Sequence, residues 1–133
     1  MNILFAGSPH SAAKVLDSLS NESNINIKAV ITQPDKRGKR GSKLIESAVA
    51  NKARSLNIKT FKPEYLDNDN LKAELSSIDV EFLIVVAYGK IIPSWLLNLP
   101  TVAPINIHFS ILPKYRGASP IQSAILNGDT STG

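Results

Sequence analysis

The 133-residue sequence contains no cysteine and only two histidines, which lie far apart in the chain. The absence of cysteine excludes disulfides, thiolate catalysis and zinc sites held by cysteine. Two distant histidines also argue against a histidine-rich metal site, so we expect no metal. No stretch reaches the roughly 18–20 apolar residues that a membrane helix needs, and the opening MNILFAG is typical of a strand, not of a leader peptide. These absences favour a soluble cytoplasmic protein without membrane contact.

Two nucleotide-binding patterns are also missing. A dinucleotide site of the G-x-G-x-x-G type needs three glycines after a strand, and the first predicted strand ends in GSP, with Gly7 alone. No segment matches the phosphate-binding pattern G-x-x-x-x-G-K-[ST]. A nicotinamide or ATP site at this position is therefore not expected.

The basic residues are unevenly distributed. The formal net charge is +4, and the segment 34–43, PDKRGKRGSK, carries five basic residues and one acidic residue, which equals the whole excess. Such a run is commonly a solvated loop. It also suits contact with the phosphates of a nucleic acid, because phosphate binding depends on clustered lysine and arginine.

Strand-like and helix-like segments alternate along the chain. Strands are predicted at 2–7, 27–33, 58–62, 82–87 and 103–109, and helices follow each of them: after Ser8 or Ser11, from Ile45 to Asn57, at 69–77, at 93–99, and between Ser119 and Gly128. In the last helix, Ile121, Ala124 and Ile125 are expected to face the sheet. This order predicts a single α/β domain with an open, Rossmann-like, mostly parallel sheet and helices on both faces. Ligands of such sheets bind at the carboxyl ends of the strands.

The last predicted strand has one polar face. Asn106, His108 and Ser110 alternate with apolar residues in INIHFS, so their side chains share one face near the carboxyl end of the strand. A carboxamide stabilises a developing oxyanion and an imidazole transfers protons near neutral pH, a pair suited to attack on a carbonyl or formyl carbon. The alternative is that His108 is a core residue with satisfied hydrogen bonds. The other histidine, His10, is predicted to be an exposed turn residue.

The run Asn106-x-His108-x-Ser110-x-Leu112-Pro113-x-x-Arg116-Gly117 resembles the signature of folate-dependent formyltransferases. This resemblance implies a formyltransferase fold in which Asn106 and His108 are catalytic. It also implies that the turn at 110–113, which reads S-I-L-P where the family has S-L-L-P, holds the tetrahydrofolate cofactor together with the backbone near 86–88. The implied cofactor-binding residues are Ser110, Ile111, Leu112, Pro113, Val86 and Tyr88.

Four other runs are similar to the branch of this family that formylates initiator methionyl-tRNA: FAGSP at 5–9, TQPD at 32–35, VVAYGKIIP at 85–93 and ASPIQ at 118–122. In that branch the basic loop reaches the acceptor end of the tRNA, which here implies Lys39, Arg40 and Lys43. The prolines that follow the family's loop are missing from LIESAVA at 44–50. The exit of the loop is therefore expected to be more helical.

The resemblance implies transfer of a formyl group from 10-formyltetrahydrofolate to the amino group of methionyl-tRNA, without a metal, by an enzyme that is a monomer in its full-length form. The family's catalytic aspartate and C-terminal barrel domain would lie beyond Gly133. Residues 1–133 are thus expected to be the N-terminal portion of the catalytic domain, with little activity alone. The alternatives are a formyltransferase for a nucleotide-linked amino sugar or glycinamide ribonucleotide, or a noncatalytic folate- or RNA-binding fragment.

Overall fold

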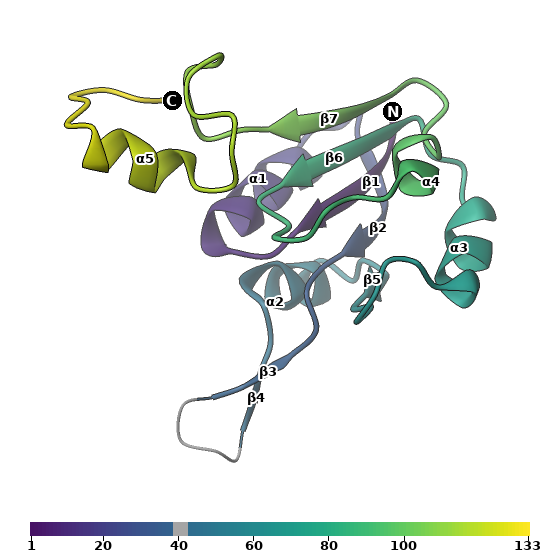
Figure 1. Cartoon of the computed structure of the whole chain (residues 1–133). Coiled ribbons are helices and arrows are strands. Elements are labelled where there is room, and N and C mark those ends of the chain that lie inside the picture. Colours follow the sequence, from purple (N-terminus) through teal and green to yellow (C-terminus); the bar gives the residue numbers. More distant parts are fainter. Residues whose placement is uncertain (39–42) are drawn as a thin grey trace.

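The computed structural model describes residues 1–38 and 43–133 and contains a five-stranded, fully parallel sheet (Figure 1). In sheet order the strands are β5 (Thr60–Phe61), β2 (Asn26–Ile31), β1 (Asn2–Gly7), β6 (Phe82–Val86) and β7 (Ala103–Ile107). The described helices are α1 (His10–Ser20), α2 (Ala48–Ser55), α3 (Asp69–Ser76), α4 (Ser94–Leu97) and α5 (Pro120–Leu126). The predicted open α/β sheet is confirmed. The third and last strands are shorter than expected.

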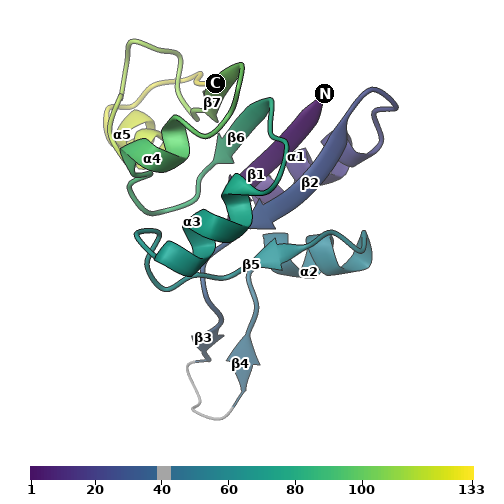
Figure 2. The same ribbon diagram turned by 90° about the vertical axis from the view of Figure 1, so that its right-hand side faces the viewer.

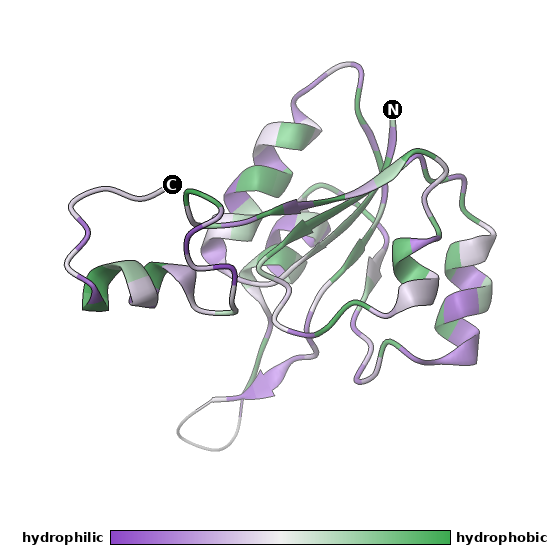
Figure 3. Cartoon of the chain, turned by 45° about the horizontal axis from the view of Figure 1, so that its top comes forward, coloured by the Kyte–Doolittle hydropathy of each residue, from purple (hydrophilic) through white to green (hydrophobic). Residues whose placement is uncertain are grey.

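Helices cover both faces of the sheet. Figures 1 and 2 show α1 and α2 on one face and α3 and α4 on the other. Along β1, Leu4 and Ala6 belong to the cluster under α3 and α4, whereas Ile3 and Phe5 belong to the cluster under α1 and α2. Successive side chains of a strand point to opposite faces, so a strand between two helical layers must be apolar throughout. Figure 3 shows this hydrophobic interior.

The first part of the basic segment pairs with the two residues that follow the segment, and this pair of strands, the basic hairpin, does not lead directly into a helix. Strands β3 (Lys36–Arg37) and β4 (Leu44–Ile45) pair antiparallel and project away from the sheet in both views (Figures 1 and 2). The expected helix from Ile45 begins instead at Ala48, because the Ser47 hydroxyl oxygen accepts a hydrogen bond from the Ala50 amide at 2.9 Å and caps the helix there. Within the loop exit 44–50, Leu44 and Ile45 are in a strand and the helix includes only the last three residues, from Ala48.

Two other helix expectations are corrected. Helix α1 begins at His10 after Pro9, without a side-chain cap from Ser8 or Ser11. Helix α5 lies beyond the carboxyl end of β7 and not over the sheet (Figure 1). Its Ala124 is buried, but Ile121 and Ile125 are 46% and 71% exposed, so these two isoleucines do not face the sheet as expected.

A buried glycine sets the separation between β1 and its neighbours. A Cβ atom on Gly7 would lie 2.8 Å from the Ala12 Cβ and 2.8 Å from the Val86 carbonyl oxygen. We expect Gly7→Ala to lower the free energy of unfolding by about 1–3 kcal/mol, since packed backbone cannot move aside cheaply. Urea unfolding measures this. Gly117→Ala is the control, because nothing lies within 4 Å of its Cβ position. Equal losses in the two variants would contradict the packing argument.

Candidate active site

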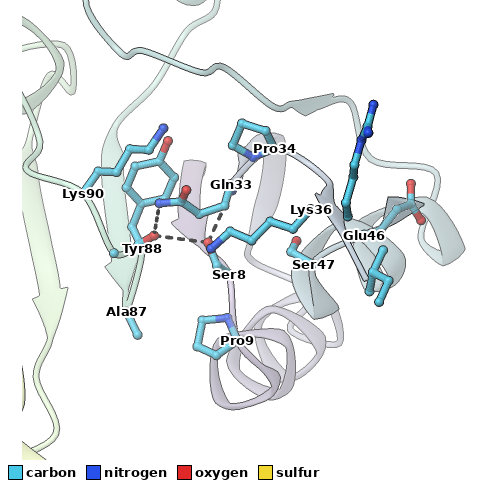
Figure 4. A pocket seen from close by; sticks show the side chains of 13 residues that line it. Ser8, Pro9, Gln33, Pro34, Lys36, Glu46, Ser47, Ala87, Tyr88 and Lys90 are labelled. Atoms are coloured by element: carbon cyan, nitrogen blue, oxygen red, sulfur yellow. Dashed lines mark hydrogen bonds between the residues drawn. The ribbon is translucent and has the colours of Figure 1, made fainter. Parts of the chain in front are cut away.

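Residues that follow three neighbouring strands are joined at the carboxyl edge of the sheet (Figure 4). The Ser8 hydroxyl, after β1, donates a hydrogen bond to the Tyr88 carbonyl oxygen at 3.2 Å and accepts one from the Gln33 amide at 3.3 Å. The Gln33 side-chain nitrogen donates to the same Tyr88 carbonyl at 3.0 Å. The runs FAGSP, TQPD and VVAYGKIIP, far apart in the sequence, therefore meet at one point. Together these bonds hold the turn that follows β6.

The turn at 87–90 has an uncommon backbone conformation. Ala87 has a φ of 44° and Gly89 a φ of 86°, both in the left-handed region. A glycine adopts this region freely, whereas a residue with a Cβ atom pays roughly 1–2 kcal/mol. Ala87 is held in place through its neighbour Tyr88. The Tyr88 carbonyl accepts two hydrogen bonds, and the Tyr88 side chain is 2% exposed. The residues of this turn line two cavities.

The phenol of Tyr88 is not suited to acid–base chemistry. Its hydroxyl is buried and has no hydrogen-bond partner among the described residues. Burial raises the pKa of Tyr88 to about 12, so the phenol stays protonated near neutral pH. The contribution of this residue to the site is its backbone carbonyl and the position of its ring.

One cavity, of about 480 Å³, contains the residues predicted to be catalytic. Asn106 lies on β7 opposite Val85 of β6. His108 is two residues further along the chain and directly follows the end of β7. Both line the same cavity, with Asn106 exposed and His108 half-buried. The other lining residues come from three parts of the chain. These are the end of β6 with the segment after it, the neighbours of His108, and the start of α5 with the residues before it: Val85, Ala87, Tyr88, Gly89, Lys90, Ile91, Ile92, Ile107, Phe109, Gly117, Ala118 and Pro120.

The hydrogen bonds of His108 define how its ring can act. The Ser110 hydroxyl donates a hydrogen bond to the Lys114 carbonyl at 2.7 Å, so its oxygen is left to accept a hydrogen bond from Nδ1–H of His108 at 2.9 Å. In the neutral ring, Nε2 then carries the lone pair. Nε2 lies 3.3 Å from the Gly117 carbonyl oxygen, which becomes its hydrogen-bond acceptor once Nε2 is protonated. The arrangement therefore provides a base whose protonated form has acceptors at both nitrogens.

The predicted cofactor residues occupy several environments. Ser110 is 6% exposed and its hydroxyl forms a hydrogen bond with the His108 ring, whereas Ile111 and Leu112 are each 58% exposed. Within the described part of the chain, the lining of the His108 cavity includes none of residues 110–113. The Val86 side chain is buried under α1 and α2, and Tyr88 lines the cavity. The assignment of these residues to the cofactor stays a prediction.

A second cavity, of about 590 Å³, lies on the other side of the turn (Figure 4). Its wall includes Lys36, Arg37 and Lys90 against one carboxylate, that of Glu46, with hydroxyl and amide groups from Ser8, Ser47 and Gln33. Such a wall suits an anionic ligand that also accepts hydrogen bonds. Sequence reasoning missed Ser8 and Gln33. Their only signal was their place in FAGSP and TQPD.

Of the predicted tRNA-binding residues, Lys43 directly precedes β4. Lys39 and Arg40 lie outside the described residues. Lys43 is exposed, and its carbonyl oxygen accepts a hydrogen bond from the Gly38 amide at 3.2 Å across the hairpin. Lys36, Arg37 and Lys43 form no ion pair with any residue that the structure describes.

Within residues 1–38 and 43–133, no three His, Asp or Glu side chains are grouped so that they could hold a metal ion. No helix in that part of the chain has the length and apolar character to cross a membrane. Asp129, which follows α5, accepts a hydrogen bond from the Tyr115 hydroxyl at 3.0 Å and so fastens the loop after Pro113.

Comparison with known proteins places this geometry in a family. All of residues 1–133 match the family described as formyl transferase. The chain is 44% identical over 133 residues to a methionyl-tRNA formyltransferase of Halothermothrix orenii, and it spans 42% of the length of that relative. Two solved phosphoribosylglycinamide formyltransferases share the fold. The enzyme of Bacillus halodurans has a TM-score of 0.72 and 20% identity over 100% of this chain and 69% of its own. The enzyme of Anaplasma phagocytophilum has a TM-score of 0.71 and 22% identity over 96% and 59%. The chain belongs to the formyl transferase family.

Proposed function

We propose that the protein transfers a formyl group from 10-formyltetrahydrofolate to the amino group of initiator methionyl-tRNA, in the cytoplasm, with residues 1–133 as the N-terminal portion of the catalytic domain. The observation that carries the proposal is the shared cavity of Asn106 and His108, which one turn separates from a basic cavity. The name of the relative that is 44% identical supports the choice of acceptor.

Asn106 and His108 have complementary parts in the proposed reaction. The folate donor supplies the formyl carbon, which the methionyl amine attacks. The Asn106 carboxamide donates a hydrogen bond to the formyl oxygen as negative charge develops there. Nε2 of His108 takes a proton from the attacking amine, and the Gly117 carbonyl accepts a hydrogen bond from the resulting imidazolium. His108 then returns the proton to the leaving nitrogen, so the charges balance over the transfer.

The His108 cavity has a composition that fits a planar, polar ring. Apolar side chains of Ile91, Ile92 and Phe109 line it, and the turn at 87–90 adds backbone groups. We assign the pterin to this cavity. Tyr88 contacts the pterin from the cavity wall in this proposal. The Ser110–Pro113 turn, with Ile111 and Leu112, and the backbone at Val86 do not line this cavity, and we assign them to the part of the folate outside it. No metal takes part in this scheme.

The basic hairpin is proposed to bind the acceptor end of the tRNA. Lys39, Arg40 and Lys43 are the residues assigned to this contact. Lys36 and Arg37 support it, because they extend the same positive surface from the hairpin into the basic cavity. A surface of this kind contacts phosphates without reading bases.

A smaller acceptor is the second candidate. The shared fold with phosphoribosylglycinamide formyltransferases, and a basic cavity that would also accept a single phosphate, favour glycinamide ribonucleotide over other small amines. When both acceptors are offered to the full-length protein with labelled 10-formyltetrahydrofolate, we expect the label on methionyl-tRNA. Preferential labelling of glycinamide ribonucleotide would replace the proposed acceptor.

His108 should be required for the transfer step. In the full-length protein, we expect His108→Ala to lower the rate of formyl transfer by on the order of 10²–10⁴-fold, the usual contribution of a positioned acid–base group. Single-turnover assays measure the rate. His10→Ala is the matched control, because His10 is exposed at the start of α1. Similar rates for the two variants would exclude His108 as the proton acceptor.

RNA binding should depend on salt through the hairpin. Binding to phosphates releases counterions, with a log–log slope of roughly −0.7 to −0.9 per contact. We expect the double variant Arg37→Ala/Lys43→Ala to weaken tRNA binding and to make the slope less steep by about two units. Fluorescence anisotropy over a range of salt concentrations measures both quantities. An unchanged slope would mean that these side chains only face solvent.

A further inference from the structure

Four charged side chains join the base of the basic hairpin to the body of the protein. Lys62, just after β5, donates a hydrogen bond to Asp35 Oδ1 at 2.7 Å and to Glu46 Oε1 at 2.8 Å. Arg54 of α2 binds the other oxygen of Glu46. Asp35 directly precedes β3 and Glu46 directly follows β4. One ammonium group therefore holds both strands of the hairpin.

The ion pairs of Lys62 are shielded more than ordinary surface pairs. The side chains of Lys62, Asp35 and Glu46 are 28%, 26% and 25% exposed. Burial is the largest single effect and lowers the pKa of Lys62, but the hydrogen bonds to Asp35 and Glu46 and the negative charges of both carboxylates together outweigh it, so the net pKa is raised. The hydrogen bond from Lys62 is the largest of the effects that lower the pKa of Glu46. At neutral pH the raised pKa of Lys62 and the lowered pKa of Glu46 keep this pair charged.

Apart from these ion pairs, the apolar side chains of β4 do little to fix the direction of the hairpin. Leu44 and Ile45 of β4 are 61% and 57% exposed, so its apolar side chains are not packed in the core. The two pairs between β3 and β4 hold the strands to each other and not to the sheet. The exit segment 44–50, LIESAVA, has no proline that would restrict its backbone. The Thr32 and Ser47 hydroxyls, 2.6 Å apart, also join the residue after Glu46 to the end of β2, and Pro34 restricts the backbone before Asp35. The ion pairs of Lys62 are the tie that holds both sides of the hairpin base at once.

We propose that Asp35, Lys62 and Glu46 form a charge clamp that sets the direction of the basic hairpin and so positions it for RNA. The RNA part of this inference rests on the proposed function. Lys62 is a positioning residue in this scheme, since its charge is taken up by the two carboxylates. Pre-ordering the hairpin reduces the entropy lost when RNA binds, and that raises affinity.

The clamp has a signature that simple electrostatics does not share. Asp35 and Glu46 are negative charges beside a surface for phosphates. If they acted only through their charge, neutralising either would strengthen RNA binding. If they act through the clamp, Asp35→Asn and Glu46→Gln weaken RNA binding, because the hairpin loses its direction. The sign of the change distinguishes the two cases.

Spin labels test whether the cluster orients the hairpin, independently of RNA. The chain has no cysteine, so Leu44→Cys on β4 and Ser18→Cys on α1 give two unique labelling sites. We expect a narrow distribution of distances by pulsed electron resonance, and a broader or shifted one when Glu46→Gln is added. A second label pair at Ser18→Cys and Ser76→Cys, within the body, should not change. An unchanged Leu44 distribution would overturn the clamp.

The affinity for initiator tRNA, measured at a fixed salt concentration, tests whether the clamp positions the hairpin for RNA. We expect Asp35→Asn and Glu46→Gln each to weaken binding by roughly fivefold. Glu74→Gln is the matched control, because it also removes one carboxylate from an ion pair with a lysine. Glu74 lies 2.8 Å from Lys59 and belongs to α3, which is far from the hairpin in the sequence. The control should bind as tightly as the unsubstituted protein, or slightly more tightly.

Each result decides between the inferences. Tighter RNA binding by the Asp35 or Glu46 variants would overturn the positioning role. A broadened hairpin with unchanged RNA affinity would do the same, while leaving the clamp itself in place. If the unsubstituted protein binds no tRNA, the proposed function and the RNA role of the clamp both fail. The label distances then still decide whether the cluster orients the hairpin.

Discussion

The carbonyl oxygen of Tyr88 is the point on which the candidate site depends. It accepts hydrogen bonds from Ser8 and Gln33, which follow the two other central strands. These contacts fix the turn after β6 in a conformation that Ala87 would not adopt unaided. The same turn lines both the cavity with Asn106 and His108 and the basic cavity. The positions of both cavities therefore follow from one main-chain oxygen and the three strands that end around it.

Much of the fold could be predicted because its signals are local and periodic. The unbroken apolar run of β6 indicates a strand covered on both faces, and the order of elements indicates parallel pairing. The hairpin could not be predicted in this way. Its strands have two residues each, too few for a period, and the spacing of Ile45 and Val49 also fits a helix. The direction of α5 was missed because an apolar stripe does not specify what it packs against.

Only part of the geometry of the candidate site could be predicted from the sequence. Asn106 and His108 are two positions apart near a strand end, so alternation alone puts them on one side of the sheet. The partners of Ser8 and Gln33 were not predictable, because a side chain that bonds to a distant carbonyl leaves no periodic pattern. Ser110 was assigned to the cofactor from a motif. The structure adds its contact with the imidazole, which depends on the geometry of a turn.

The wall between the cavities, residues 87–90, has a thermodynamic consequence. Ala87, Tyr88, Gly89 and Lys90 line both cavities, so an occupant of either one touches the same four residues. Any ordering or displacement of this wall by one occupant changes the free energy of binding of the other. Linkage requires that effect to be equal in both directions. Wherever one occupant does order or displace this wall, the affinity for either ligand depends on whether the other is bound.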